Sequence, residues 1–155
     1  MICVKAVDAE RQYARCMTNG SATLPSLLTP SVISVVDDDA SMRASMDNLL
    51  RSRGYVVHTF GSAEEFLGSA CLNDTSCVIS DVQMSPMNGL ELLANVRRRG
   101  HAAPFILITA YPDESVRACA VEAGAAFLAK PFAMPKLIAC LDAALQSALA
   151  SRNCS

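Results

Sequence analysis

Apolar residues in this chain gather in five short runs that are too continuously apolar for surface helices. The runs are rich in β-branched or aromatic residues, which is typical of strands buried on both faces. They cover residues 32–36, 55–60, 77–80, 105–109 and 125–129. We therefore predict five buried strands.

Segments with helical character separate these runs, at residues 40–52, 62–71, 89–99, 112–123 and 134–150. Ser62 and Glu65 have the spacing of a capping box, in which each side chain accepts a hydrogen bond from the other residue's backbone N–H. Five strands alternating with five helices predict an α/β protein of the (βα)5 type. Its doubly wound parallel sheet should carry helices on both faces, joined by right-handed crossovers.

The first 30 residues lack this alternation. Residues 19–31 are rich in Ser, Thr, Pro and Gly, so we predict that residues 1–30 form a poorly ordered extension with one helical stretch around residues 8–17. Residues 31–150 should form one domain, of about the usual size for a single hydrophobic core, and residues 151–155 a tail. We expect no output domain in this sequence.

Composition narrows the function classes. The 155 residues carry 13 Lys and Arg against 15 Asp and Glu, a formal net charge of -2, which disfavours binding of nucleic acid through overall charge. The apolar runs are much shorter than the roughly 20 residues that a membrane span needs. We therefore expect neither a nucleic acid nor a membrane as a direct partner.

The seven cysteines fit neither a disulfide framework nor a zinc site. They are odd in number, include no Cys-x-x-Cys pair and lie mostly among aliphatic residues, while His58 and His101 are far apart in the sequence. Buried reduced thiols fit this usage better. The charged N-terminus is unlike a secretory signal, so the sequence predicts a reducing, cytoplasmic location.

Polar residues stand at the ends of four predicted strands. They are Asp37, Asp38 and Asp39 after the first strand, Asp81 after the third, Thr109 at the end of the fourth and Lys130 after the fifth. In open parallel sheets the ligand site lies at the carboxyl ends of the strands, where the strand order reverses. Grouped carboxylates need a neutralising cation, and oxygen ligands without His or thiolate favour Mg²⁺. Acids, a hydroxyl and a lysine together suit phosphoryl transfer to a carboxylate.

The stretches that contain these residues resemble the receiver domain of two-component response regulators. The matching stretches are residues 35–43, 80–92, 107–110 and 130–132, and the resemblance extends over residues 31–150. The segment from Phe127 to Phe132 is most similar to receivers of nitrogen-fixation-type transcriptional regulators. The resemblance implies a flavodoxin-like sheet with strand order 2-1-3-4-5.

The resemblance also implies which residues handle the phosphoryl group. Asp81 corresponds to the phosphoacceptor, and Lys130 to the lysine that pairs with the phosphoryl oxygens. Thr109 and Phe127 correspond to the hydroxyl and aromatic pair that move together on activation. Tyr111 is a bulky residue two positions after Thr109. We expect it either to shield the acyl phosphate from water or to be a core tyrosine without a kinetic role.

A metal site is implied in the same way. Asp38 corresponds to the acid that ligates Mg²⁺ directly, with Mn²⁺ as the alternative ion, and Asp37 assists directly or through water. Asp81 and the backbone carbonyl of Gln83 would complete the protein ligands, whereas Asp39 is expected to be an accessory or surface charge. Ser85 stands where the family usually has proline, and this departure is expected to affect the loop that carries Gln83.

The implied function is that of a phosphoacceptor receiver in a two-component phosphorelay. A sensor histidine kinase would donate the phosphoryl group, and a downstream protein would bind the fourth helix, fifth strand and fifth helix. Phosphorylation-dependent homodimerisation is a further expectation, and no catalysis is expected beyond the domain's own phosphorylation and dephosphorylation. A phosphorylation-independent interaction domain and a phosphate sink are the alternatives.

Two rivals from other function classes fit the sequence less well. A hydrolase with an aspartyl-phosphate intermediate needs a second Asp two residues after the nucleophile, and Gln83 occupies that position. A flavin or nucleotide binder needs a Gly-rich or Ser/Thr-rich phosphate loop after the first strand, where three aspartates would repel the ligand.

Overall fold

The computed structural model of the chain describes residues 30–153. The predicted N-terminal extension, its helical stretch and the last two residues of the predicted tail lie outside the described residues, so the division of the chain into these parts stays a prediction.

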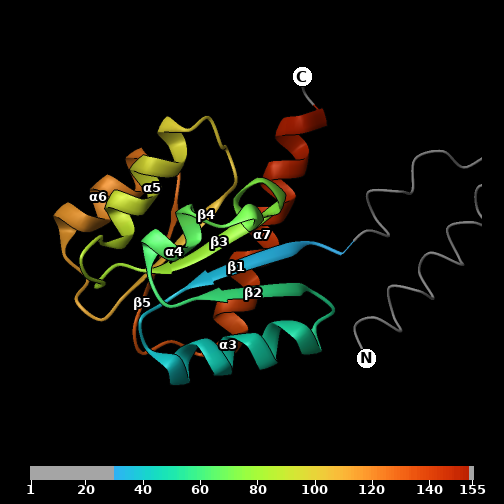
Figure 1. Cartoon of the computed structure of the whole chain (residues 1–155), viewed down its shortest axis with the longest axis horizontal. Coiled ribbons are helices and arrows are strands. Elements are labelled where there is room, and N and C mark those ends of the chain that lie inside the picture. The colour runs from blue at the N-terminus through green and yellow to red at the C-terminus, as the bar shows by residue number, and fades with distance from the viewer. Residues whose placement is uncertain (1–29, 154–155) are drawn as a thin grey trace, which may run out of the picture.

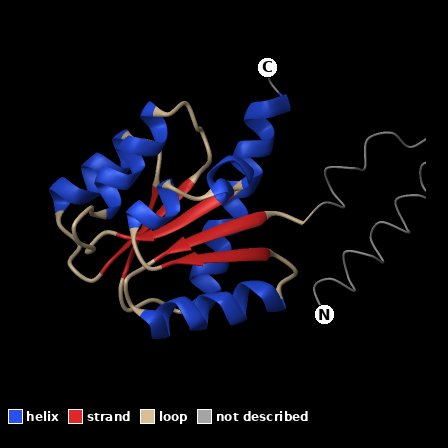
Figure 2. Cartoon of the chain, viewed as in Figure 1, coloured by secondary structure: helices blue, strands red, loops and turns tan. Residues whose placement is uncertain are grey.

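Five parallel strands form one sheet in the order β2-β1-β3-β4-β5, as predicted. Figure 2 shows the strands, in red, side by side in one sheet with helices around them. The strands are β1 (Val32–Val36), β2 (Val56–Phe60), β3 (Cys77–Asp81), β4 (Phe105–Thr109) and β5 (Ala126–Ala129). Each begins and ends within one residue of the predicted run. The prediction of five buried strands is correct for the central strands β1, β3 and β4. It is wrong for the edge strands: β2 exposes His58 and Thr59, and β5 is only partly buried, because each has a neighbouring strand on one side only.

Helices cover both faces of this sheet (Figure 1). The helices α3 (Ala40–Ser52) and α7 (Met134–Asn153) pack on one face. The other face is covered by α4 (Ala63–Leu67), α5 (Gly89–Arg98) and α6 (Glu114–Glu122). Within residues 30–153, no helix combines the length and apolarity needed to cross a bilayer.

Two hydrophobic clusters, one on each face, account for the apolar strands. In β1, Ile33 and Val35 belong to the cluster under α3 and α7, and Val36 belongs to the cluster under α4, α5 and α6. Strand β4 likewise divides its buried residues between the two clusters. This double burial fixes the register of the strands and thereby the positions of the residues at their carboxyl ends.

The predicted helix over residues 62–71 is shorter than expected. Helix α4 ends at Leu67 with Gly68 as its C-cap, and the Ser69 hydroxyl donates a hydrogen bond to the Phe66 carbonyl at 2.7 Å. The chain then continues as a separate 3-10 helix, η1 (Ala70–Asp74). Glycine followed by serine breaks the helix because both residues favour the turn conformation.

The predicted capping box at the start of α4 is only half formed. The Ser62 side chain accepts from the Glu65 N–H at 3.1 Å, but the Glu65 carboxylate accepts from Gly61 N–H at 3.0 Å instead of from Ser62. A complete capping box lies instead at the start of α5, where Asn88 and Glu91 satisfy each other's backbone N–H groups. That box fixes the end of the loop that leaves β3.

Candidate functional site

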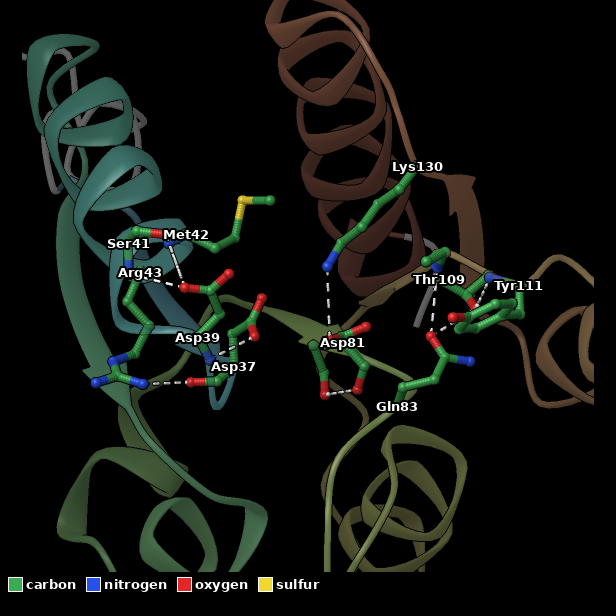
Figure 3. A network of polar contacts seen from close by, with 12 residues as sticks. Asp37, Asp39, Ser41, Met42, Arg43, Asp81, Gln83, Thr109, Tyr111 and Lys130 are labelled. Atoms are coloured by element: carbon green, nitrogen blue, oxygen red, sulfur yellow. Dashed lines mark hydrogen bonds and ion pairs between the residues drawn. The ribbon is translucent and has the colours of Figure 1, made fainter.

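The residues predicted to act together lie at the carboxyl edge of the sheet. Asp37 follows β1, Asp81 ends β3 and Lys130 follows β5. Figure 3 shows the side chains of Asp37, Asp81 and Lys130 directed toward a common space. The site lies where the chain, having placed β2 on one side of β1, crosses to place β3 on the other, which is where ligands bind in sheets of this kind.

Asp81 occupies the centre of this site and is only 7% exposed. Its Oδ2 lies 3.6 Å from the Lys130 Nζ, whereas its Oδ1 is buried with no hydrogen-bond partner in the described part of the chain. Burial raises the pKa of Asp81, and the positive charge of Lys130 opposes that rise. A buried carboxylate oxygen without a partner is costly unless a ligand completes it.

Three carboxylates meet here. Each of Asp37, Asp38 and Asp81 offers an oxygen within 4.8 Å of the others. The pKa of Asp37 is raised, chiefly by burial and further by the negative charges of Asp81 and Asp38, while the Asp39 N–H donates to its Oδ1 at 3.0 Å and opposes the shift. Such a cluster fits a hard divalent cation, since its ligands are all oxygen and its charges repel one another without one.

Asp39 is a helix cap. Its Oδ1 accepts hydrogen bonds from the Ser41 N–H at 2.9 Å and the Ser41 hydroxyl at 2.7 Å at the start of α3, and these bonds lower its pKa. The expectation of an accessory or surface charge is correct in that Asp39 is exposed, but the capping role was missed. An Asp directly before a predicted helix is the sequence signal that could have revealed it.

Arg43 is a second residue that the sequence did not single out. From the first turns of α3, its Nη1 donates to the Asp37 backbone carbonyl at 2.6 Å. This bond ties the loop that carries the acidic cluster to the helix. Arg43 thus stabilises the position of Asp37 without contacting its carboxylate oxygens.

Thr109 is fully buried, and its hydroxyl faces Gln83. The hydroxyl donates to the Gln83 Oε1 at 2.8 Å and accepts from the Tyr111 N–H at 3.0 Å. The Gln83 Oε1 also accepts from the Ala110 N–H at 3.3 Å. The sequence predicted a role for the Gln83 backbone carbonyl, but it missed this role of the side chain.

Phe127 and Thr109 lie on the same face of the sheet. Leu107 pairs with Phe127 and Thr109 pairs with Ala129, so Phe127 lies two residues farther from the carboxyl edge than Thr109 does. Phe127 is half-buried against the cluster under α4, α5 and α6. The arrangement permits coupling between the two side chains, and their joint movement stays a prediction.

An open, mainly apolar groove of about 550 Å³ lies beside Lys130. Its lining includes Met42 from α3, Tyr111 from the loop after β4, and Phe132 and Met134 around the start of α7. Tyr111 is 73% exposed. The groove therefore offers a flexible apolar surface next to the acidic cluster.

A family model, the response regulator receiver domain, matches residues 33–142. Among curated proteins, Nodulation protein W of Bradyrhizobium diazoefficiens is 39% identical over 119 residues, which are 76% of this chain and 52% of that protein. Transcriptional regulatory protein FixJ of the same organism is 36% identical over 123 residues, 79% of this chain and 60% of FixJ. The chain thus spans little more than half the length of these relatives.

Solved structures agree with the fold. The crystal structure of FixJ-N has a TM-score of 0.68 at 31% identity and covers 76% of this chain and 95% of that chain. The chemotaxis protein CheY4 of Vibrio cholerae has a TM-score of 0.70 at 28% identity, with 76% of this chain and all of that chain covered. Both similarities support the predicted strand order and the receiver-like arrangement of helices around it.

Proposed function

This chain belongs to the response regulator receiver domain family of two-component signalling systems, and we propose that Asp81 is its phosphoacceptor. The observation that carries the proposal is the state of the Asp81 carboxylate. One oxygen is buried without a partner among residues 30–153, and the other faces the Lys130 ammonium at 3.6 Å. A nucleophile held in this way has one oxygen free for bond formation and a positive charge beside it.

The transfer itself would need few protein groups. An Asp81 carboxylate oxygen attacks the phosphorus of a phosphohistidine, a P–O bond forms as the P–N bond breaks, and the imidazole leaves with the electron pair of that bond and takes up a proton. Lys130 neutralises charge on the phosphoryl oxygens. Burial raises the pKa of Asp81 and thereby favours the protonated carboxyl group. The ammonium of Lys130 opposes this shift and favours the ionised carboxylate, which is the form that attacks phosphorus.

Asp38, Asp37 and Asp81 are the proposed ligands of Mg²⁺, with Mn²⁺ as an alternative and the Gln83 backbone carbonyl as a fourth protein ligand. The three carboxylates fit this ion because they supply only oxygen and lie within 4.8 Å of one another. When bound, the ion would supply positive charge that offsets both the acidic cluster and the transferred phosphoryl group.

The proposed phosphodonor is a sensor histidine kinase. The apolar groove formed in part by Met42, Phe132 and Met134 borders Lys130 and provides contact surface for such a donor. Beyond its own phosphorylation and dephosphorylation, the domain would catalyse nothing.

The signal is proposed to leave through the face formed by α6, β5 and α7, toward a downstream protein or a second phosphorylated copy of the chain. Val121 on α6 is 63% exposed and offers apolar surface for contact with a protein. Free thiols at Cys71, Cys77, Cys119 and Cys140 support a reducing, cytoplasmic location. The expectation that these thiols are buried is correct for Cys77 and wrong for the other three described cysteines, of which Cys119 is exposed.

The test is phosphorylation of the full chain by acetyl phosphate with Mg²⁺, followed by intact mass. We expect one phosphoryl adduct on the native chain, removed by hydroxylamine as an acyl phosphate should be, and none in a chelator. Asp81→Asn should take up no adduct, whereas Asp74→Asn, at an exposed residue of η1, should behave as the native chain does. An undiminished adduct on Asp81→Asn would refute the assignment.

A further inference from the structure

The Thr109 hydroxyl already uses its single proton in a hydrogen bond. It has one proton, which it donates to the Gln83 Oε1 at 2.8 Å, and it accepts the Tyr111 N–H at 3.0 Å. Thr109 is 0% exposed, so bulk water offers no alternative acceptor for that proton. Figure 3 shows the Gln83 amide directed toward Thr109, while the Lys130 ammonium is directed toward Asp81.

A phosphoryl group on Asp81 would bring new acceptor oxygens to the same edge of the sheet. Because a hydroxyl has a single proton, Thr109 can donate either to Gln83 or to a phosphoryl oxygen, but not to both. The two acceptors compete directly. Gln83 follows Asp81, the last residue of β3, by two positions, so both acceptors would come from one short segment of the chain.

We propose that the Gln83 side chain is a latch: it holds the Thr109 hydroxyl in the unphosphorylated state, and the phosphoryl group must displace it. Gln83 is thus a positioning residue that acts through Thr109. The inference rests on the proposed phosphoacceptor function of Asp81 and adds a residue that opposes the phosphorylated state.

Breaking the hydrogen bond between Gln83 and Thr109 should cost little free energy. Gln83 is exposed, so water can replace Thr109 at its Oε1. The Ala110 N–H, 3.3 Å from the same oxygen, keeps the amide near the end of β4 after release. Removing a single neutral hydrogen bond of this kind should change an affinity by about 3- to 10-fold.

The test measures the affinity for beryllium trifluoride, a phosphoryl mimic, by calorimetry on the full chain with Mg²⁺. Gln83→Ala and the similarly sized Gln83→Met both remove the amide acceptor at an exposed position. We expect each to lower the Kd by about 3- to 10-fold.

A double-mutant cycle with Thr109→Val separates the latch from a simple loop contact. Thr109→Val removes the hydroxyl that Gln83 would hold. In that background, Gln83→Ala should therefore leave the Kd for beryllium trifluoride unchanged. Equal or weaker binding by both Gln83 variants, or the same gain with and without the hydroxyl, would overturn the latch. A native chain that binds no beryllium trifluoride and takes up no phosphoryl group would overturn the proposed function as well.

Discussion

Asp81→Asn should stabilise the metal-free protein, although it removes the proposed phosphoacceptor. Native Asp81 faces two other carboxylates and a single ammonium. Burial raises the pKa of Asp81, so the native state binds its proton more tightly than the unfolded state does, and stability falls as the pH rises through that pKa. An asparagine removes this cost at neutral pH while nearly preserving the shape of the side chain.

The distances give the magnitude. The carboxylate oxygens lie within 4.8 Å of one another, and two unit charges at that upper limit repel by about 0.9 kcal/mol at a dielectric constant of about 80 and by about 3.5 kcal/mol at about 20. Two such repulsions outweigh the attraction of Lys130 at 3.6 Å by about 0.6 to 2.3 kcal/mol over that range. Asp38 is exposed and screened by solvent, so we expect a gain near the lower end, about 1 kcal/mol.

The assay is thermal unfolding in a chelator at neutral pH, followed by circular dichroism because the chain has no tryptophan. A gain of about 1 kcal/mol should raise the Tm by about 3 to 6 °C for a domain of this size. The gain should shrink toward acidic pH, where Asp81 is protonated in the native state. In saturating Mg²⁺ the native chain should have the higher Tm. At a hundred times its Kd the ion stabilises the native chain by about 2.7 kcal/mol, and it should stabilise Asp81→Asn less because that variant lacks one of the proposed ligands.

The control for charge alone is Asp74→Asn, an exposed substitution outside the cluster that should change stability by less than about 0.5 kcal/mol. A Tm for Asp81→Asn equal to or below that of the native chain in the chelator would refute the reasoning, as would a gain matched by Asp74→Asn.

Three further substitutions test other parts of the site. Gly89→Ala would place a Cβ 2.5 Å from the Asp81 carbonyl oxygen. We expect it to lower the free energy of unfolding, measured with denaturant, by about 1 to 3 kcal/mol and to slow labelling by acetyl phosphate. The control is Gly61→Ala, which should be tolerated because the atom nearest to its Cβ would be 3.5 Å away. Lys130→Met removes the ammonium 3.6 Å from Asp81 and should slow labelling by about 100-fold or more; a rate within a factor of a few of the native one would contradict its role. Tyr111→Ala should lose its phosphoryl group faster than the native chain, as followed by intact mass over time, and an equal or slower loss would show that Tyr111 does not shield the site.

The central strands β1, β3 and β4 could be predicted from the sequence because burial on both faces leaves a plain signature, an uninterrupted apolar run. The same signature gave the positions of the edge strands β2 and β5 but overstated their burial. The helix boundaries depend on weaker local effects. Helix α6 begins at Glu114 with Asp113 as its cap, not at residue 112, and residues 62–71 divide between α4 and η1 because Gly68 and Ser69 interrupt the helix. Such ends are decided by individual hydrogen bonds that a hydrophobic pattern does not record.

The candidate site was predictable where it depends on the topology alone. Parallel strands bring their carboxyl ends to one edge, so Asp37, Asp81 and Lys130 had to lie near one another once the strands were recognised. The role of the Gln83 side chain was not predictable in this way. Its partner Thr109 is 26 residues away, and only the conformation of the loop after β3 aims the amide at that hydroxyl instead of at solvent.

Thr109 makes two kinds of hydrogen bond. Its backbone bonds belong to the sheet, whereas its side-chain bonds can exchange partners. The backbone of Thr109 is held by the ladder between β4 and β5, where the Lys130 N–H donates to the Thr109 carbonyl at 2.7 Å. Among residues 30–153, the side-chain hydroxyl makes hydrogen bonds with the Gln83 Oε1 and the Tyr111 N–H. Exchange of the hydroxyl from Gln83 to a phosphoryl oxygen would therefore break none of the backbone hydrogen bonds that hold Thr109 in the sheet. Phe127 lies on the same face of the sheet as Thr109, so the proposed movement of the two side chains would take place on that one face.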